Sequence, residues 1–136
     1  MNQKYLGSCL CGDVRFEVSG DFESFFLCHC QYCQKDTGSA HAANLFSSKA
    51  VLTWLKGEEK TKAFCLPSTR HTKSFCSNCG SALPNYDTKL CTLVVPAGCL
   101  DSKVSIVPDA HIFVGSRADW EQDLDRVAKI TGLPED

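Results

Sequence analysis

The sequence has neither a long apolar run nor a block of like charges. No apolar stretch approaches the ~18 residues of a membrane-spanning helix, so no membrane partner is predicted. The formal net charge is only −2, and no five or six like charges follow one another, which gives no electrostatic reason to expect binding to nucleic acid. Repeats, low-complexity segments and linkers are also missing. This favours one zinc-binding domain over residues 1–136, once the cysteines described below are considered.

No apolar stretch follows residues 1–5, so the sequence predicts no secretory signal. We therefore expect the protein in the cytoplasm, where thiols stay reduced. In a reducing compartment, clustered cysteines indicate a metal-binding or catalytic role rather than disulfide bonds. A secreted disulfide scaffold is the alternative to this interpretation.

Cysteine, in contrast, is abundant, with 10 residues in 136. Most of them gather in three tight clusters: Cys9 and Cys11; Cys28, Cys30 and Cys33; and Cys76 and Cys79. Cysteines one or two residues apart can turn both sulfur atoms toward one ion, whereas a disulfide across so short a loop is strained. Because such clusters are the usual ligands of zinc in proteins, the sequence predicts two zinc ions per chain.

The two outer pairs would together complete a tetrahedral four-thiolate site. Each pair is followed by a glycine, Gly12 or Gly80, which lets the backbone turn its N–H groups toward sulfur. A zinc ion there would tie the N-terminal strand to the middle of the chain, and its binding energy, on the order of 10 kcal/mol, would count as folding energy. The predicted structural ligands are Cys9, Cys11, Cys76 and Cys79. Two unrelated buried pairs are the alternative.

The central triplet would leave a metal ion one ligand short, and an open position is what zinc chemistry needs. Three thiolates would give the centre a net charge near −1, which weakens zinc as a Lewis acid toward bound water. The same charge suits a substrate thiol that loses its proton to the site and stays nucleophilic. We predict Cys28, Cys30 and Cys33 as ligands of this catalytic zinc. Two alternatives stay open: a site empty at rest, and a structural zinc closed by His29, Cys65, Cys91, Cys99 or a distant histidine.

The remaining pattern predicts a mainly β fold. Val14, Phe16 and Val18 alternate with polar residues, as in a half-buried strand. Further strands are expected at 25–27, 42–46, 51–55, 60–66, 90–95 and 111–114, with a hairpin turn at 56–59. A helical turn is expected after Cys30. A C-terminal helix is expected from Asp119 to about Gly132, because its apolar residues follow helical spacing.

Taken together, these residues resemble the family of glutathione-dependent formaldehyde-activating enzymes, which includes the relatives of centromere protein V. The matching motifs are Gly7-Ser8-Cys9-Leu10-Cys11-Gly12, Cys28-His29-Cys30-Gln31-Tyr32-Cys33 and Phe75-Cys76-Ser77-Asn78-Cys79-Gly80, with weaker matches at 111–114 and 118–120. The resemblance implies a β-tent fold of antiparallel sheets with zinc-binding knuckles at strand ends. It also implies the same structural and catalytic zinc ligands as the spacing does.

The activity that the resemblance implies is that of a carbon–sulfur lyase, which joins formaldehyde to glutathione as S-hydroxymethylglutathione or cleaves that adduct. The expected partners are a glutathione-like thiol and an aldehyde. Lys35, Arg70 and Lys73 are candidates for holding the carboxylates of such a thiol, with solvated surface charge as the favoured alternative. His29 is the best-placed histidine for an acid–base role, with a surface or hydrogen-bonded core histidine as the favoured alternative. A non-catalytic zinc-stabilised module and a thiol or metal sensor are the competing hypotheses.

Overall fold

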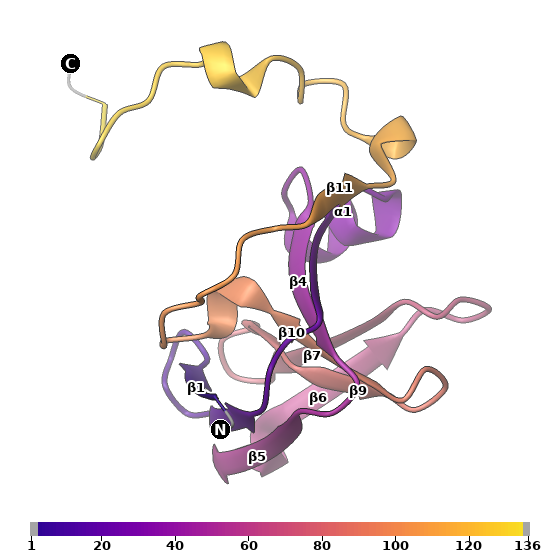
Figure 1. Cartoon of the computed structure of the whole chain (residues 1–136), viewed down its shortest axis with the longest axis vertical. Helices are drawn as coiled ribbons and strands as arrows, with labels where there is room; N and C mark the ends of the chain where they lie inside the picture. The colour runs from indigo at the N-terminus through magenta and orange to yellow at the C-terminus, as the bar shows by residue number, and fades with distance from the viewer. Residues whose placement is uncertain (1–2, 135–136) are drawn as a thin grey trace.

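The computed structural model describes residues 3–134, and its strands form three sheets (Figure 1). The first sheet has the order β1-β2-β5: β1 (Lys4–Ser8), β2 (Arg15–Ser19) and β5 (Val51–Lys56). The second has the order β11-β3-β4-β10-β9: β3 (Ser24–Cys28), β4 (Ala42–Ser47), β9 (Asn85–Asp87), β10 (Thr92–Pro96) and β11 (Ala110–Ile112). The third has the order β6-β7-β8: β6 (Thr61–Cys65), β7 (Thr72–Cys76) and β8 (Ala82–Leu83). The predicted mainly β class is confirmed, and among the described strands only β11 pairs in parallel, with β3.

One buried cluster receives side chains from all three sheets. Phe16 and Val18 of β2 are fully buried, as the alternation of this strand predicts. Leu45 and Val95, on neighbouring strands of the second sheet, are buried with them, and Leu83 comes from the third sheet. The sheets therefore share a core, and the strand ends that carry cysteine are fixed relative to it.

The predicted hairpin turn at 56–59 is wrong. β5 belongs to the first sheet and β6 to the third, so this segment carries the chain from one sheet to another. Gly57 has a φ of 76°, and a Cβ at this position would lie 2.1 Å from the carbonyl oxygen of Asp13. The crossing is therefore possible only where the chain has no side chain and can adopt a left-handed conformation.

The only α-helix in the described part of the chain is α1 (Gln31–Thr37), where a helical turn was predicted. Cys30 is its N-cap, and its sulfur accepts a hydrogen bond from the Cys33 N–H at 3.3 Å. A side-chain acceptor at this position satisfies one of the free N–H groups of the first turn. Two cysteines of the triplet thus also start the helix.

The predicted C-terminal helix is wrong. Between 119 and 132, within the described residues, the chain forms only the 3-10 turn Leu124–Arg126, and Figure 1 shows this yellow segment reaching away from the sheets. Leu124 and Val127, which follow helical spacing, are 45% and 57% exposed. A short helix depends on packing of its apolar face, so spacing alone does not stabilise it here. None of the described helices has the length and apolar character to cross a membrane.

Replacing Gly57 by alanine is expected to lower the free energy of unfolding by about 2 kcal/mol or more, because the new Cβ meets a backbone oxygen and the left-handed φ becomes strained. Urea unfolding followed by circular dichroism measures the change. Gly115→Ala is the matched control, because a Cβ there meets nothing within 4 Å. Equal unfolding midpoints for the two variants would contradict the prediction.

Candidate metal centres

The two outer cysteine pairs meet in space. Their four sulfur atoms lie within 4.8 Å of one another, with 3.5 Å between Cys9 and Cys11 and 3.9 Å between Cys11 and Cys76. Thiolates around a tetrahedral zinc ion, each with a bond of about 2.3 Å, lie about 3.8 Å apart. The four sulfur atoms, which include that of Cys79, therefore fit one such ion. Cys9 directly follows β1 and Cys76 ends β7, so the site joins the first sheet to the third.

Hydrogen bonds support negative charge at this four-sulfur site. The N–H of Val14 donates to the sulfur of Cys9 at 3.2 Å. The Ser81 hydroxyl, 3.2 Å from the Cys79 sulfur, and the Ser81 N–H lower the pKa of the Cys79 thiol to about 5. Such contacts stabilise thiolate ligands, and the backbone N–H that reaches Cys9 is that of Val14, two residues after Gly12.

The sulfur atoms of the triplet Cys28, Cys30 and Cys33 also lie within 4.8 Å of one another. Burial raises the pKa of the Cys33 thiol well above its usual range. Burial also opposes ionisation of Cys30, but the Cys33 N–H and the neighbouring thiols outweigh it and lower the pKa of Cys30. Three adjacent thiols cannot all ionise beside one another unless a cation balances them, so the donor set fits a soft divalent ion.

No fourth histidine, cysteine, aspartate or glutamate joins this triplet within the described residues. His29, between two of its cysteines, is turned away and contacts other partners. Two of the other candidates contact backbone carbonyls: the thiol of Cys99 contacts that of Pro96 at 3.0 Å, and the thiol of Cys91 contacts that of Thr88 at 3.7 Å. Among the described residues, the triplet thus offers three sulfur donors and no fourth side-chain ligand.

A cavity of about 840 Å³ reaches Cys33 of the triplet. It is bounded by α1, β4, β6, β7 and β9, and Trp54, Tyr86 and Cys65 line part of it. The cationic side chains of Arg70, Lys73 and Lys89 also line it, together with the imidazole of His71. Two of the predicted carboxylate-binding residues, Arg70 and Lys73, are therefore in place, whereas Lys35 is exposed and not part of the lining.

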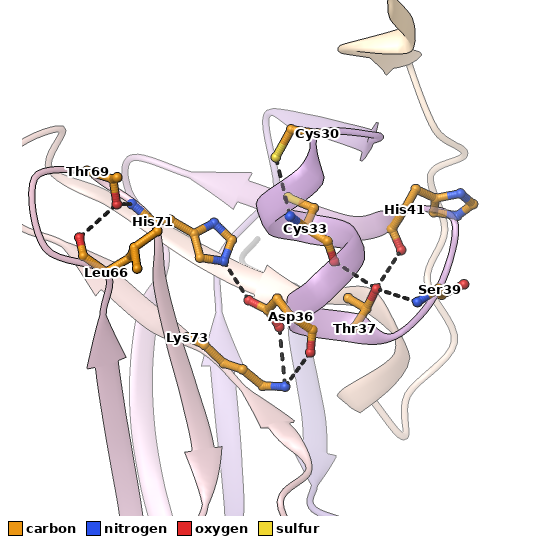
Figure 2. Close-up of polar contacts among 10 residues, drawn as sticks. All are labelled: Cys30, Cys33, Asp36, Thr37, Ser39, His41, Leu66, Thr69, His71 and Lys73. Carbon is orange, nitrogen blue, oxygen red and sulfur yellow. Dashed lines mark hydrogen bonds and ion pairs between the residues drawn. The ribbon is translucent and has the colours of Figure 1, made fainter. Parts of the chain in front are cut away.

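Figure 2 shows two of these side chains, His71 and Lys73, in contact with Asp36. Asp36 of α1 accepts from His71 at 2.8 Å, and its other carboxylate oxygen lies 3.3 Å from the Lys73 Nζ. Lys73 also donates to the Asp36 carbonyl oxygen at 2.6 Å, so it fastens α1 to β7. Arg70 and Lys89 have no ion pair with any described residue. These two charges are the ones free to meet an anionic ligand.

A cluster of histidines lies on the other side of the triplet. His29 is 1% exposed; its Nδ1 lies 2.8 Å from a Glu121 carboxylate oxygen and its Nε2 2.8 Å from His111 Nδ1. The His41 ring packs against His29 at 5.1 Å between centroids. Sequence analysis named His29 but gave Glu121 no role, because Glu121 lies 92 positions from His29 in a segment predicted to be helical.

Comparison with known proteins identifies the family. The family model described as glutathione-dependent formaldehyde-activating enzyme matches residues 4–116. A protein of Halomonas elongata, provisionally named a glutathione-dependent formaldehyde-activating enzyme, is 34% identical over 124 residues, which cover 84% of this chain and 77% of that protein. A Rhodobacter sphaeroides protein of known crystal structure shares the fold, with a TM-score of 0.55 and 23% identity over 78% of this chain and 98% of that one. The chain therefore belongs to the family of glutathione-dependent formaldehyde-activating enzymes.

Proposed function

We propose that this protein is a zinc-dependent carbon–sulfur lyase that forms or cleaves S-hydroxymethylglutathione. The observation that carries the proposal is the cysteine triplet, which has three sulfur atoms within 4.8 Å, no fourth ligand from the described chain and a cationic cavity beside it. The family name supports glutathione and formaldehyde as the reactants. A purely structural role would need only the four-sulfur site.

Two zinc ions are proposed, and the chain supplies suitable donors for both. Cys9, Cys11, Cys76 and Cys79 would hold the structural ion, and Cys28, Cys30 and Cys33 the catalytic one. When bound at the triplet, zinc would stabilise an incoming thiol as its thiolate. Cysteines stay available as thiol ligands in a reducing compartment, so we place the protein in the cytoplasm. We also treat residues 1–136 as one zinc-binding domain.

The cavity positions the thiol substrate. Glutathione carries two carboxylates, and Arg70 and Lys89 are the unpaired cations of the lining that can bind them. With its sulfur at the triplet, a new C–S bond forms to the formaldehyde carbon, and the thiol proton ends on the former carbonyl oxygen. Cleavage of the adduct runs through the same steps in reverse. Lys73 and Asp36 keep α1, and with it Cys33, fixed against β7 during these steps.

Cys30→Ser and Cys76→Ser are expected to remove different metal ions with different consequences. Wild-type protein should hold two zinc equivalents, and Cys30→Ser should lose one while keeping its circular dichroism spectrum. Cys76→Ser should lose the other and unfold, because on the order of 10 kcal/mol of folding energy depends on a structural site of this kind. Zinc released to a chromogenic chelator, measured beside thermal unfolding, tests both. A single zinc ion in folded wild-type protein would contradict the assignment.

Zinc-loaded protein is expected to accelerate the exchange between formaldehyde, glutathione and S-hydroxymethylglutathione beyond the spontaneous rate. Exchange spectroscopy with ¹³C-formaldehyde measures this rate directly. Cys30→Ser is the inactive control because it loses the metal of the triplet but keeps the fold. If fully metallated protein leaves the rate unchanged, glutathione and formaldehyde are not its reactants, and a binding or sensing role takes precedence.

Arg70→Ala is expected to raise KM for glutathione about 10-fold with little change in kcat, because the lost charge-assisted hydrogen bond acts on binding. Lys35→Ala is the matched control, since Lys35 is an exposed cation outside the cavity lining. Initial rates at varied glutathione concentration measure both constants. Equal KM values for the two variants would remove Arg70 from the binding site.

A further inference from the structure

We propose that His29, His41 and Glu121 form a third metal site, one that takes a divalent transition-metal ion through nitrogen and oxygen ligands. One nitrogen of each imidazole and one carboxylate oxygen lie within 4.8 Å of one another. Ligands at the bond lengths of zinc to nitrogen and oxygen, about 2.0–2.2 Å, lie roughly 3.0–3.6 Å apart. His29 Nδ1 and Glu121 are already 2.8 Å apart, so binding requires only a small adjustment of the side chains.

One buried nitrogen of this cluster lacks a hydrogen-bond partner. Among the described residues, His41 Nδ1 is the one buried side-chain nitrogen or oxygen without a hydrogen-bond partner. A buried polar atom left in this state costs about 1–3 kcal/mol, and native proteins rarely leave one without a reason. In Figure 2 the His41 imidazole points away from the cluster of Asp36 and His71. An ion bonded to this nitrogen would satisfy it.

The surrounding contacts resemble those that support metal ligands. His29 Nε2 lies 2.8 Å from His111 Nδ1, and an outer partner of this kind fixes the orientation of a metal-binding imidazole. The backbone around His29 is also fixed, because its N–H bonds to the Ile112 carbonyl at 2.9 Å and its carbonyl accepts from the Gln34 side chain at 2.8 Å. His29 is therefore held in position before an ion arrives, with the Glu121 carboxylate hydrogen-bonded to it.

The donor types of this cluster also suit a divalent metal ion. The His41 ring packs against the His29 ring, with 5.1 Å between the ring centroids. The Glu121 side chain is 11% exposed and supplies one negative charge. Two imidazoles and one carboxylate suit Zn²⁺, Co²⁺, Ni²⁺ or Fe²⁺, whereas the thiolate clusters select softer ions, so the sites differ in metal preference.

A metal ion at this site would hold the C-terminal segment, which follows β11, against the rest of the protein. Glu121 is the ligand that comes from beyond β11, in the segment whose apolar residues Trp120, Leu124 and Val127 are largely exposed. Without an ion, the side-chain contact of Glu121 is a hydrogen bond to His29. With an ion, this segment would be bound directly to the corner between β3 and α1, beside the cysteine triplet.

Cobalt titration of the full-length protein, first loaded with zinc at its thiolate sites, tests the proposal. We expect one further Co²⁺ equivalent, with visible d–d absorption but without the near-ultraviolet charge-transfer bands of Co²⁺–thiolate bonds. Imidazole ¹⁵N resonances of His29 and His41 should broaden, and those of His71 should not. Charge-transfer bands would instead report exchange of cobalt into the cysteine clusters, so a failure of the zinc assignment is seen separately.

Variants separate this site from adventitious binding. His41→Gln and Glu121→Gln should lose the further equivalent while keeping the thiolate-bound zinc, and His111→Gln should weaken cobalt binding about 10-fold to 100-fold, as expected for an outer partner. His71→Gln is the matched control, because His71 also pairs with a carboxylate at 2.8 Å but belongs to no group of three candidate ligands among residues 3–134. Saturation of wild-type protein without the further equivalent, or its persistence in His41→Gln, would overturn the proposal.

Discussion

The approach of four sulfur atoms from two different sheets is the constraint on which the structure depends. Cys9 and Cys11 follow the first strand of one three-stranded sheet, whereas Cys76 ends β7 of another and Cys79 follows it. Nearby, the Asp13 carboxylate accepts hydrogen bonds from Lys60 and Asn78. The backbone of Gly57 passes close to the carbonyl oxygen of Asp13. Small sheets bury little apolar surface alone, so a cation among the sulfurs would supply much of the binding between them.

The sequence Cys28-His29-Cys30 serves two clusters at once. It forms the corner between β3 and α1, where Cys28 and Cys30 turn toward Cys33 and the intervening His29 turns to the opposite side. Because adjacent side chains of extended chain point to opposite faces, one backbone segment can present sulfur on one side and imidazole on the other. Any movement of this corner would alter both clusters together.

How well the sequence predicts each feature depends on how far apart along the chain the contacting residues lie. The cysteine groups follow from local spacing, and β2 follows from alternation, because one buried face is enough to define a strand. The C-terminal helix failed because its apolar residues have no surface to pack against, and the 56–59 turn failed because hairpins and crossings between sheets have similar turn residues. Glu121 was missed because its contact with His29 spans 92 positions.

The boundary of the family match separates the two functional proposals. Residues 4–116 contain every cysteine of the two thiolate clusters, so the lyase proposal rests on features that the family model covers. Glu121 lies beyond this range, although its partners His29, His41 and His111 lie within it. The histidine cluster can therefore be completed only by a segment outside the matched region. A metal ion bound there is a property to be tested in this chain itself, because membership in the family does not imply it.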